Sequence, residues 1–135
     1  MGNIGNTFKT GSLTLPGRAK KVWREIRHQY PAGGKIANIS DWSSVGLIPA
    51  GTPCKYDSSA KTVTAYKDTT ITGTADASAL AALGINGFTQ EDIYLDGATI
   101  ATATVIYDGE IYDYFFSSAM LAKIVGLVPQ VIFVH

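Results

Sequence analysis

The amino-acid sequence predicts an α+β domain in which short strands dominate. Three observations lead to this prediction. From about residue 35 onward, short runs rich in β-branched and aromatic residues alternate with glycine, proline and aspartate. Two runs of alanine, leucine and similar residues follow good helix-capping side chains, which predicts two short helices. Cationic residues concentrate near the N-terminus, which predicts an extended basic arm beside the strand-rich part.

Four segments have the composition of strands. Residues 53–56 and 62–67 combine β-branched or aromatic side chains with smaller or polar ones, and residues 69–74 continue this pattern. Pro129 introduces the last segment, residues 130–135, which contains the apolar run Val131-Ile-Phe-Val134. These segments predict the framework of a small sheet.

A β-hairpin is the clearest local prediction. Residues 98–107 and 110–116 are rich in strand-forming residues, and Asp108-Gly109 between them is a pair preferred in type I′ turns. Aromatic side chains crowd this hairpin, and we expect them to form core and the contact between copies of the chain. The residues expected at that contact are Tyr107, Tyr112, Tyr114 and Phe115.

The two helices are predicted from their caps. Asp76 is a natural N-cap for residues 77–83, and Ser117 is one for residues 119–125. A glycine follows each run, as expected where a helix ends.

The charge divides the chain into a basic arm, residues 1–44, and a β-rich domain, residues 45–135. Hydrophobic residues make up 46% and charged residues only 16%, so we expect partners to cover part of the surface. Residues 1–35 carry seven cationic residues and one acidic residue, so the arm suits an acidic partner surface. Within it, residues 18–27 are expected to form a short helix that orders on docking. The expected docking residues are Lys9, Arg18, Lys20, Lys21, Trp23, Arg24 and Arg27.

Residues suited to catalysis are scattered and lack evident partners. His28 lies in the basic arm, and His135 is the last residue. Cys54 is the single cysteine, and we expect a small buried thiol. The pair Glu91-Asp92 lacks the spacing of a calcium loop. We therefore expect no enzyme, cofactor, metal site or small-molecule substrate, and the absence of a long apolar run predicts no membrane span or secretory signal.

Three segments, taken in order, resemble a known family. They are Gly46-Leu-Ile-Pro-Ala-Gly-Thr-Pro53, then Gly84-Ile-Asn-Gly87 with Glu91-Asp92-Ile93, then residues 101–112 with a short helix and the closing strand 129–134. Their succession resembles that of the tailed-phage capsid decoration and head-fibre proteins, a group that includes the lambda-like head decoration proteins. The resemblance covers about residues 45–135.

The resemblance implies a structural function. The body would be a small β domain of tulip or barrel type, on the outside of the virion after assembly in the host cytoplasm. A homotrimer would bind the major capsid protein of the mature icosahedral head and stabilise the shell, or form the base of a head fibre. The arm would contact the capsid, and the hairpin aromatics would join the copies.

Two other functions stay open. Trp23, Tyr30 and Trp42 accompany the basic residues of the arm, a mixture that single-strand nucleic-acid binders use, although the acidic remainder of the chain opposes nucleic acid. The tyrosine-rich hairpin would also suit a glycan-binding surface module.

Overall fold

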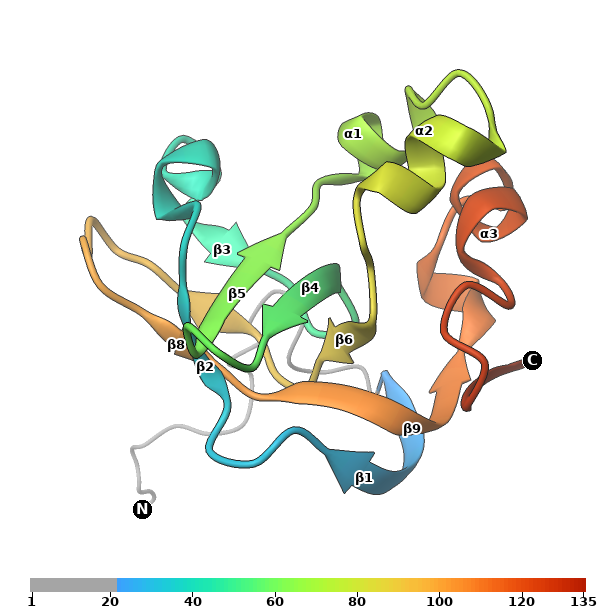
Figure 1. Ribbon diagram of the computed structural model, residues 1–135, viewed down its shortest axis with the longest axis horizontal. Coiled ribbons are helices and arrows are strands. Elements are labelled where there is room, and N and C mark those ends of the chain that lie inside the picture. The colour runs from blue at the N-terminus through green and yellow to red at the C-terminus, as the bar shows by residue number, and fades with distance from the viewer. Residues whose placement is uncertain (1–21) are drawn as a thin grey trace, which may run out of the picture.

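The computed structural model describes residues 22–135, which fold around one curled sheet and three short α-helices (Figure 1). The elements, in chain order, are β1 (Trp23–Gln29), β2 (Gly34–Ile36), the 3₁₀ turn η1 (Ile39–Trp42), β3 (Leu47–Ile48), β4 (Pro53–Asp57), β5 (Thr62–Ala65), α1 (Asp68–Thr72), α2 (Ala77–Ala82), β6 (Gly87–Thr89), β7 (Ile93–Tyr94), β8 (Thr102–Ala103), β9 (Val105–Tyr112), η2 (Asp113–Phe115), α3 (Ser118–Ile124) and β10 (Val131–Val134).

The eight-stranded sheet has the order β1-β9-β6-β4-β5-β2-β8, with β10 beside β9, and it curls into a half-barrel (Figure 1). A two-stranded sheet of β3 and β7 accompanies it. The longest strand, β9, pairs along one side with β1. Along its other side it pairs first with β6 and then with β10. Strand β9 therefore joins the N-terminal, central and C-terminal strands.

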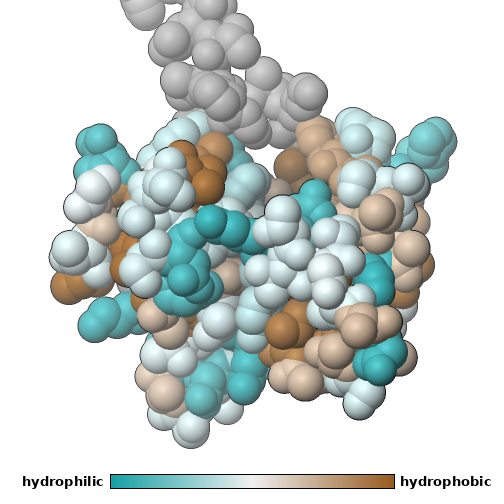
Figure 2. Space-filling view, turned by 90° about the horizontal axis from the view of Figure 1, so that it is seen from above, coloured by the Kyte–Doolittle hydropathy of each residue, from teal (hydrophilic) through white to brown (hydrophobic). Residues whose placement is uncertain are grey.

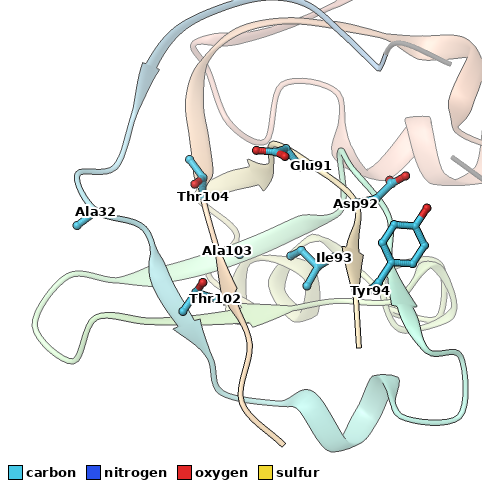
Figure 3. Close-up of a pocket in the computed structure, with 8 residues that line it drawn as sticks. All are labelled: Ala32, Glu91, Asp92, Ile93, Tyr94, Thr102, Ala103 and Thr104. Atoms are coloured by element: carbon cyan, nitrogen blue, oxygen red, sulfur yellow. The ribbon is translucent and has the colours of Figure 1, made fainter. Parts of the chain in front are cut away.

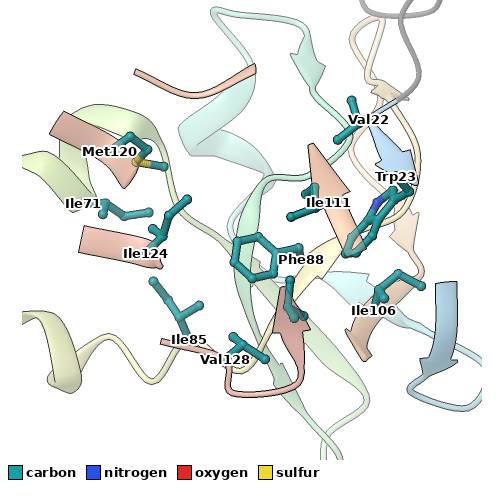
Figure 4. Close-up of a cluster of buried hydrophobic side chains, with 11 residues drawn as sticks. Val22, Trp23, Ile71, Ile85, Phe88, Ile106, Ile111, Met120, Ile124 and Val128 are labelled. Atoms are coloured by element: carbon teal, nitrogen blue, oxygen red, sulfur yellow. The ribbon is translucent and has the colours of Figure 1, made fainter. Parts of the chain in front are cut away.

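The core consists of two clusters, and β9 contributes to both. Ile106 packs with Trp23 and Phe88 in the first cluster, which extends to the helices (Figure 4). The adjacent Val105 packs in the second cluster, with Trp42 and residues of the central strands. Successive residues of a strand point to opposite faces, so this strand has buried side chains on both of its faces.

Several local predictions are confirmed. Strands β4, β5 and β10 lie where the sequence predicts strands. The Asp76 carboxylate accepts a hydrogen bond from the Ala79 amide at 2.9 Å and caps α2. The Ser117 hydroxyl accepts one from the Met120 amide at 3.2 Å and caps α3. The strand-dominated fold class is likewise confirmed.

The prediction of a strand over residues 69–74 is wrong, because α1 occupies this segment. Its threonines favour strands, but Ile71 is fully buried in the first cluster, against residues of α3. Burial of this side chain outweighs the weak local preference.

The prediction of a hairpin turn at Asp108-Gly109 is also wrong, because the single strand β9 continues through both residues. Gly109 lies opposite Ile26 of β1. A β-carbon at Gly109 would come within 2.5 Å of the Glu25 carbonyl oxygen. The glycine therefore permits the close approach of two strands. A glycine in a tight turn and a glycine at a close strand contact look the same in the local sequence, so the sequence alone does not tell them apart.

The helix predicted over residues 18–27 is wrong from Trp23 onward, where β1 forms instead. Residues 22–44, assigned to the arm by their charge, contain β1, β2 and η1 of the folded domain. Their placement follows from burial, since Val22, Trp23 and Trp42 are core residues. The rest of the predicted helix lies outside the described residues.

Candidate interaction surfaces

A charged strip lies along β1 and β9. Arg24 forms an ion pair with Glu110. Arg27 Nε donates to Asp108 Oδ1 at 3.0 Å, and His28 Nδ1 lies 2.7 Å from Asp108 Oδ2. We call these five residues the charged strip.

Contacts within the charged strip shift the pKa values of Asp108, Arg24 and Arg27. The pKa of the Asp108 carboxyl is lowered, chiefly by its hydrogen bond with His28 and then by Arg27. Hydrogen bonds to Glu110 and Asp108 raise the pKa values of Arg24 and Arg27, respectively. The two arginines are thus already compensated by acids of the same domain, which leaves them less able to attract another anion.

The residues expected to dock the arm separate into three groups. Lys9, Arg18, Lys20 and Lys21 lie outside the described residues. Arg24 and Arg27 belong to the charged strip. Trp23 is only 5% exposed, and its Nε1 donates to the Thr89 carbonyl at 3.0 Å, so its indole is a core group and is not available to a partner.

The four residues expected at a contact between copies lie in two different places in the fold. Tyr107 is half-buried, and its ring lies 4.7 Å from that of Tyr30, centroid to centroid. Tyr30 in turn stacks on Tyr56 at 4.5 Å. Burial raises the pKa of Tyr30, in keeping with a packed ring. Tyr107 thus belongs to an internal aromatic row.

The other three, Tyr112, Tyr114 and Phe115, lie at or just after the C-terminal end of β9, close to the end of β10. The Tyr112 and Tyr114 rings lie 5.3 Å apart, and the Tyr114 and Phe115 rings 4.6 Å apart. Val134 is the register partner of Tyr112, which places both on the same face of the sheet. Tyr114 is 60% exposed and Ile132 51%. We call Tyr112, Tyr114, Phe115, Ile132 and Val134 the terminal apolar surface.

Elsewhere the surface is mixed. Figure 2 shows one face on which hydrophobic residues lie in separate patches between hydrophilic ones. In the terminal apolar surface, ring contacts join Tyr112 to Tyr114 and Tyr114 to Phe115, and strand pairing joins Tyr112 to Val134. Ile132 lies on the same strand as Val134, opposite Glu110 of the charged strip. Tyr114 and Ile132 are its exposed members and the other three are half-buried, and a partly exposed apolar cluster of this kind is typical of an interaction site.

A hydrogen-bonded loop, residues 49–52, holds the motif Gly46–Pro53 against β6. Gly51 N donates to the Thr89 carbonyl at 2.8 Å, and Thr89 N donates to the Thr52 carbonyl at 3.0 Å. The Thr89 hydroxyl accepts from Thr52 N at 3.0 Å and donates to the Pro49 carbonyl at 2.9 Å. Both threonines are buried, so these hydrogen bonds are needed to offset their desolvation.

The same loop is tied to the second motif. The Asp92 Oδ1 atom accepts from Ala50 N at 2.8 Å. Gly51 has a φ of +82°, and a β-carbon there would lie 2.9 Å from Val22 Cγ1 and 3.1 Å from Ile111 Cδ1. Glycine is therefore required both by conformation and by packing. The sequence analysis identified these motifs but did not predict that Thr52 and Thr89 hold them together, because no local signal in the sequence indicates this role.

A cavity of about 410 Å³ lies beside β7 and β8 (Figure 3). Glu91, Asp92 and Tyr94 line it from one segment, and Thr102 and Thr104 from the other. The Asp92 Oδ2 atom is buried and has no hydrogen-bond partner. The lining thus offers hydroxyl groups, the Glu91 carboxylate and one aromatic ring.

The candidates for reactive chemistry lie apart from one another. Cys54 is fully buried, and burial strongly raises the pKa of its thiol, as expected for an inert cysteine. His28 contacts Asp108, whereas His135 Nδ1 lies 3.1 Å from Asp113 Oδ1. Within residues 22–135, no three His, Cys, Asp or Glu side chains are grouped so as to hold a metal ion.

None of the helices in the described part of the chain has both the length and the hydropathy to cross a membrane. Comparisons of the sequence with protein-family models and curated proteins, and of the chain with solved structures, found no match.

Proposed function

We propose that this chain is a structural protein of a tailed bacteriophage, bound to the outer surface of the mature icosahedral head. It acts there as a homotrimer that stabilises the shell, or as the base of a head fibre, with the major capsid protein as its partner. The proposal includes synthesis in the host cytoplasm and a final place on the virion. It also takes the curled sheet as a body of tulip or barrel type, with residues 1–21 as the extended arm.

One observation carries the proposal: the terminal apolar surface lies where the cationic segment joins the domain. The Tyr112 amide donates to the Val22 carbonyl at 2.9 Å. Residues 1–21, which precede Val22, contain four cationic residues and no acidic one. The basic segment, which suits an acidic shell, therefore enters the domain at Val22, beside an apolar surface suited to self-association.

The order of the motifs gives further support. Two of the three segments that resemble decoration proteins are joined by the hydrogen bond between Ala50 and Asp92. The third contains β9, and its Ile111 packs against Gly51 of the first. The three segments thus form one structural unit rather than isolated short matches.

The energetics suit a trimer bound to a lattice. A stable interface buries roughly 1,600 Å² in total, and apolar area contributes about 25 cal/mol per Å² before association costs are subtracted. Ordering an arm costs about 1–2 kcal/mol per residue, so a single arm binds weakly. Three arms on one trimer bind with a high effective concentration, because each attachment holds the others near their sites.

Co-sedimentation with purified mature heads tests the proposal. We expect the full chain to sediment with heads, and a truncated chain of residues 22–135 to stay in the supernatant. Lys20→Glu with Lys21→Glu should weaken binding, and more so at low salt. The matched control, Lys35→Glu with Lys61→Glu, changes two exposed lysines of the domain and should bind as the parent does. Full binding by the truncated chain would exclude the arm as the attachment.

A second candidate, glycan binding, is favoured by the cavity beside β7 and β8. Hydroxyls, a carboxylate and an aromatic ring are the kinds of group that sugars contact, and Tyr94 is 48% exposed at this cavity. A glycan array probed with the full chain tests it, with Tyr94→Ala as the comparison. Binding that Tyr94→Ala abolishes would favour this candidate, and an empty array would remove it.

A further inference from the structure

The outer edge of β10 is open. Strand β10 pairs with β9 on one side, and no strand within residues 22–135 pairs with its other side. Its sequence, Val131-Ile-Phe-Val134, carries no charge and no proline. Natural sheets protect edges with charges, prolines or bulges, because an open edge offers unpaired backbone groups to another strand. An open apolar edge of this kind is a site for strand addition.

A segment outside the described residues has the pattern of a matching strand. Residues 12–15 read Ser-Leu-Thr-Leu, with alternating polar and apolar side chains, between Gly11 and Pro16. This alternation is typical of a strand with one covered face, and the flanking glycine and proline set its limits. Both this segment and β10 have four residues.

The length and the charge of the N-terminal segment favour contact with another copy of the domain. Only residues 16–21 separate Leu15 from Val22, whose carbonyl accepts from the Tyr112 amide on the β1 side of β9, opposite β10. Residues 1–21 carry four cationic residues and no acidic one, whereas residues 22–135 carry seven cationic and eleven acidic residues. Opposite net charge therefore favours binding of this segment to the folded domain of another copy of the chain.

We propose that residues 12–15 of one copy add as a strand to the outer edge of β10 in a neighbouring copy. Leu13 and Leu15 then cover Ile132 and Val134 of the terminal apolar surface. A neighbouring copy is the donor because each chain enters its own sheet through β1, on the opposite side of β9 from β10. This inference rests on the proposed oligomer, and exchange of a terminal strand between copies is a low-cost way to build one.

Disulfide cross-linking of the full chain tests the exchange. Two single variants, Leu13→Cys and Ile132→Cys, are mixed, allowed to exchange subunits and oxidised. Cys54 is fully buried, so it gives no background. Neighbouring strands bring the Cα atoms within the roughly 4.4–6.8 Å that a disulfide requires. We expect a covalent dimer from the mixture and from neither variant alone.

A parallel mixture with Leu15→Cys allows for the other register. Failure of both mixtures to cross-link would overturn the proposal, as would a double variant, Leu13→Cys with Ile132→Cys, that forms its disulfide only within one chain. The second result would place the strand on its own domain.

The solution mass gives an independent measurement. Leu13→Asp with Leu15→Asp should raise the dissociation constant of the oligomer by at least about tenfold, since it places charges against an apolar surface. Ser12→Asp with Thr14→Asp is the matched control and should have the smaller effect. Equal effects of the two pairs would contradict the proposed alternation.

Head binding separates this inference from the proposed function. Chains that exchange strands but ignore purified heads would leave the inference standing and remove the function. Chains that bind heads without cross-linking would do the opposite.

Discussion

The two flanks of β9 end in strands of opposite character. On one flank, β1 has seven residues, mostly exposed, with arginines compensated by acids of β9 and with three irregularities in its register. On the other flank, β10 has four uncharged residues in a regular parallel register. Charge and irregularity discourage further pairing at β1, whereas β10 has neither protection.

The comparison shows that the position of charge in the sequence does not by itself locate an interaction surface. The cations of β1 make the N-terminal part of the chain appear to be a docking arm, yet their partners lie within the same domain. At the apolar end of the sheet, by contrast, the four residues of β10 are uncharged and the outer edge of the strand is unpaired within residues 22–135. Four changes, from the largest expected effect to the smallest, test this contrast.

Trp23→Ala is expected to have the largest effect, a loss of about 3–5 kcal/mol in the free energy of unfolding. The indole is buried against Phe88, edge to face at 6.5 Å between ring centroids, and anchors β1 to Thr89. Urea unfolding measures the loss. Ile26→Ala on the same strand is the control; its side chain is 37% exposed, so the loss should be well below that of Trp23→Ala.

Gly109→Ala is expected to cost about 1–3 kcal/mol, because the added methyl group meets the Glu25 carbonyl and forces β1 away from β9. Hydrogen exchange should show faster exchange at the amides of β1, while those of β5 keep their protection. Uniform loss of protection in both strands would mean that the effect is not local to the β1–β9 pairing.

Asp108→Asn is expected to reduce the dependence of stability on acidity. The folded-state pKa of Asp108 lies below its ordinary value of about 3.9, so its contribution is complete above that value. The contribution is lost as the pH falls through the lower folded-state value. The difference in unfolding free energy between parent and variant should therefore shrink on acidification from about pH 5 to about pH 2. A difference that stays constant would show that the ion pairs of the charged strip contribute no pH dependence.

Tyr114→Ser is expected to change the unfolding free energy least, by about 0.5 kcal/mol or less, because the ring is 60% exposed. Its effect should appear instead in self-association, measured by sedimentation equilibrium across concentrations. Tyr107→Ser is the contrasting variant. It removes a ring packed against Tyr30, so it should destabilise the domain more than it weakens the oligomer.

Local signals predicted local structure well. Asp76 and Ser117 each accept the hydrogen bond expected of a helix N-cap. Strands β4 and β5 pair antiparallel across a short turn, so their whole interaction lies within one stretch of sequence. In such elements the residues that decide the structure are also neighbours in the chain.

The errors arose where the deciding partner is distant in sequence. The acids that neutralise Arg24 and Arg27 lie 86 and 81 residues away. The need for glycine at position 109 comes from its contact with β1, and the hydrogen bonds of Thr89 are made with residues of the earlier loop 49–52. The chemical types at the candidate surfaces could be identified from sequence, but their pairing could not, because it depends on the order of strands in the sheet.

Both ends of the described chain meet at Tyr112: Val22 accepts its amide hydrogen bond, and Val134 is its register partner. The two ends of the described domain thus lie close together. In a chain of residues 22–135, a short linker joining these ends would permit circular permutation, and opening that chain at the exposed turn around Ser58 would keep the same strand order. Cargo fused directly to Val22 or to the residue after Val134 would emerge beside Tyr112, at the same pole of the domain.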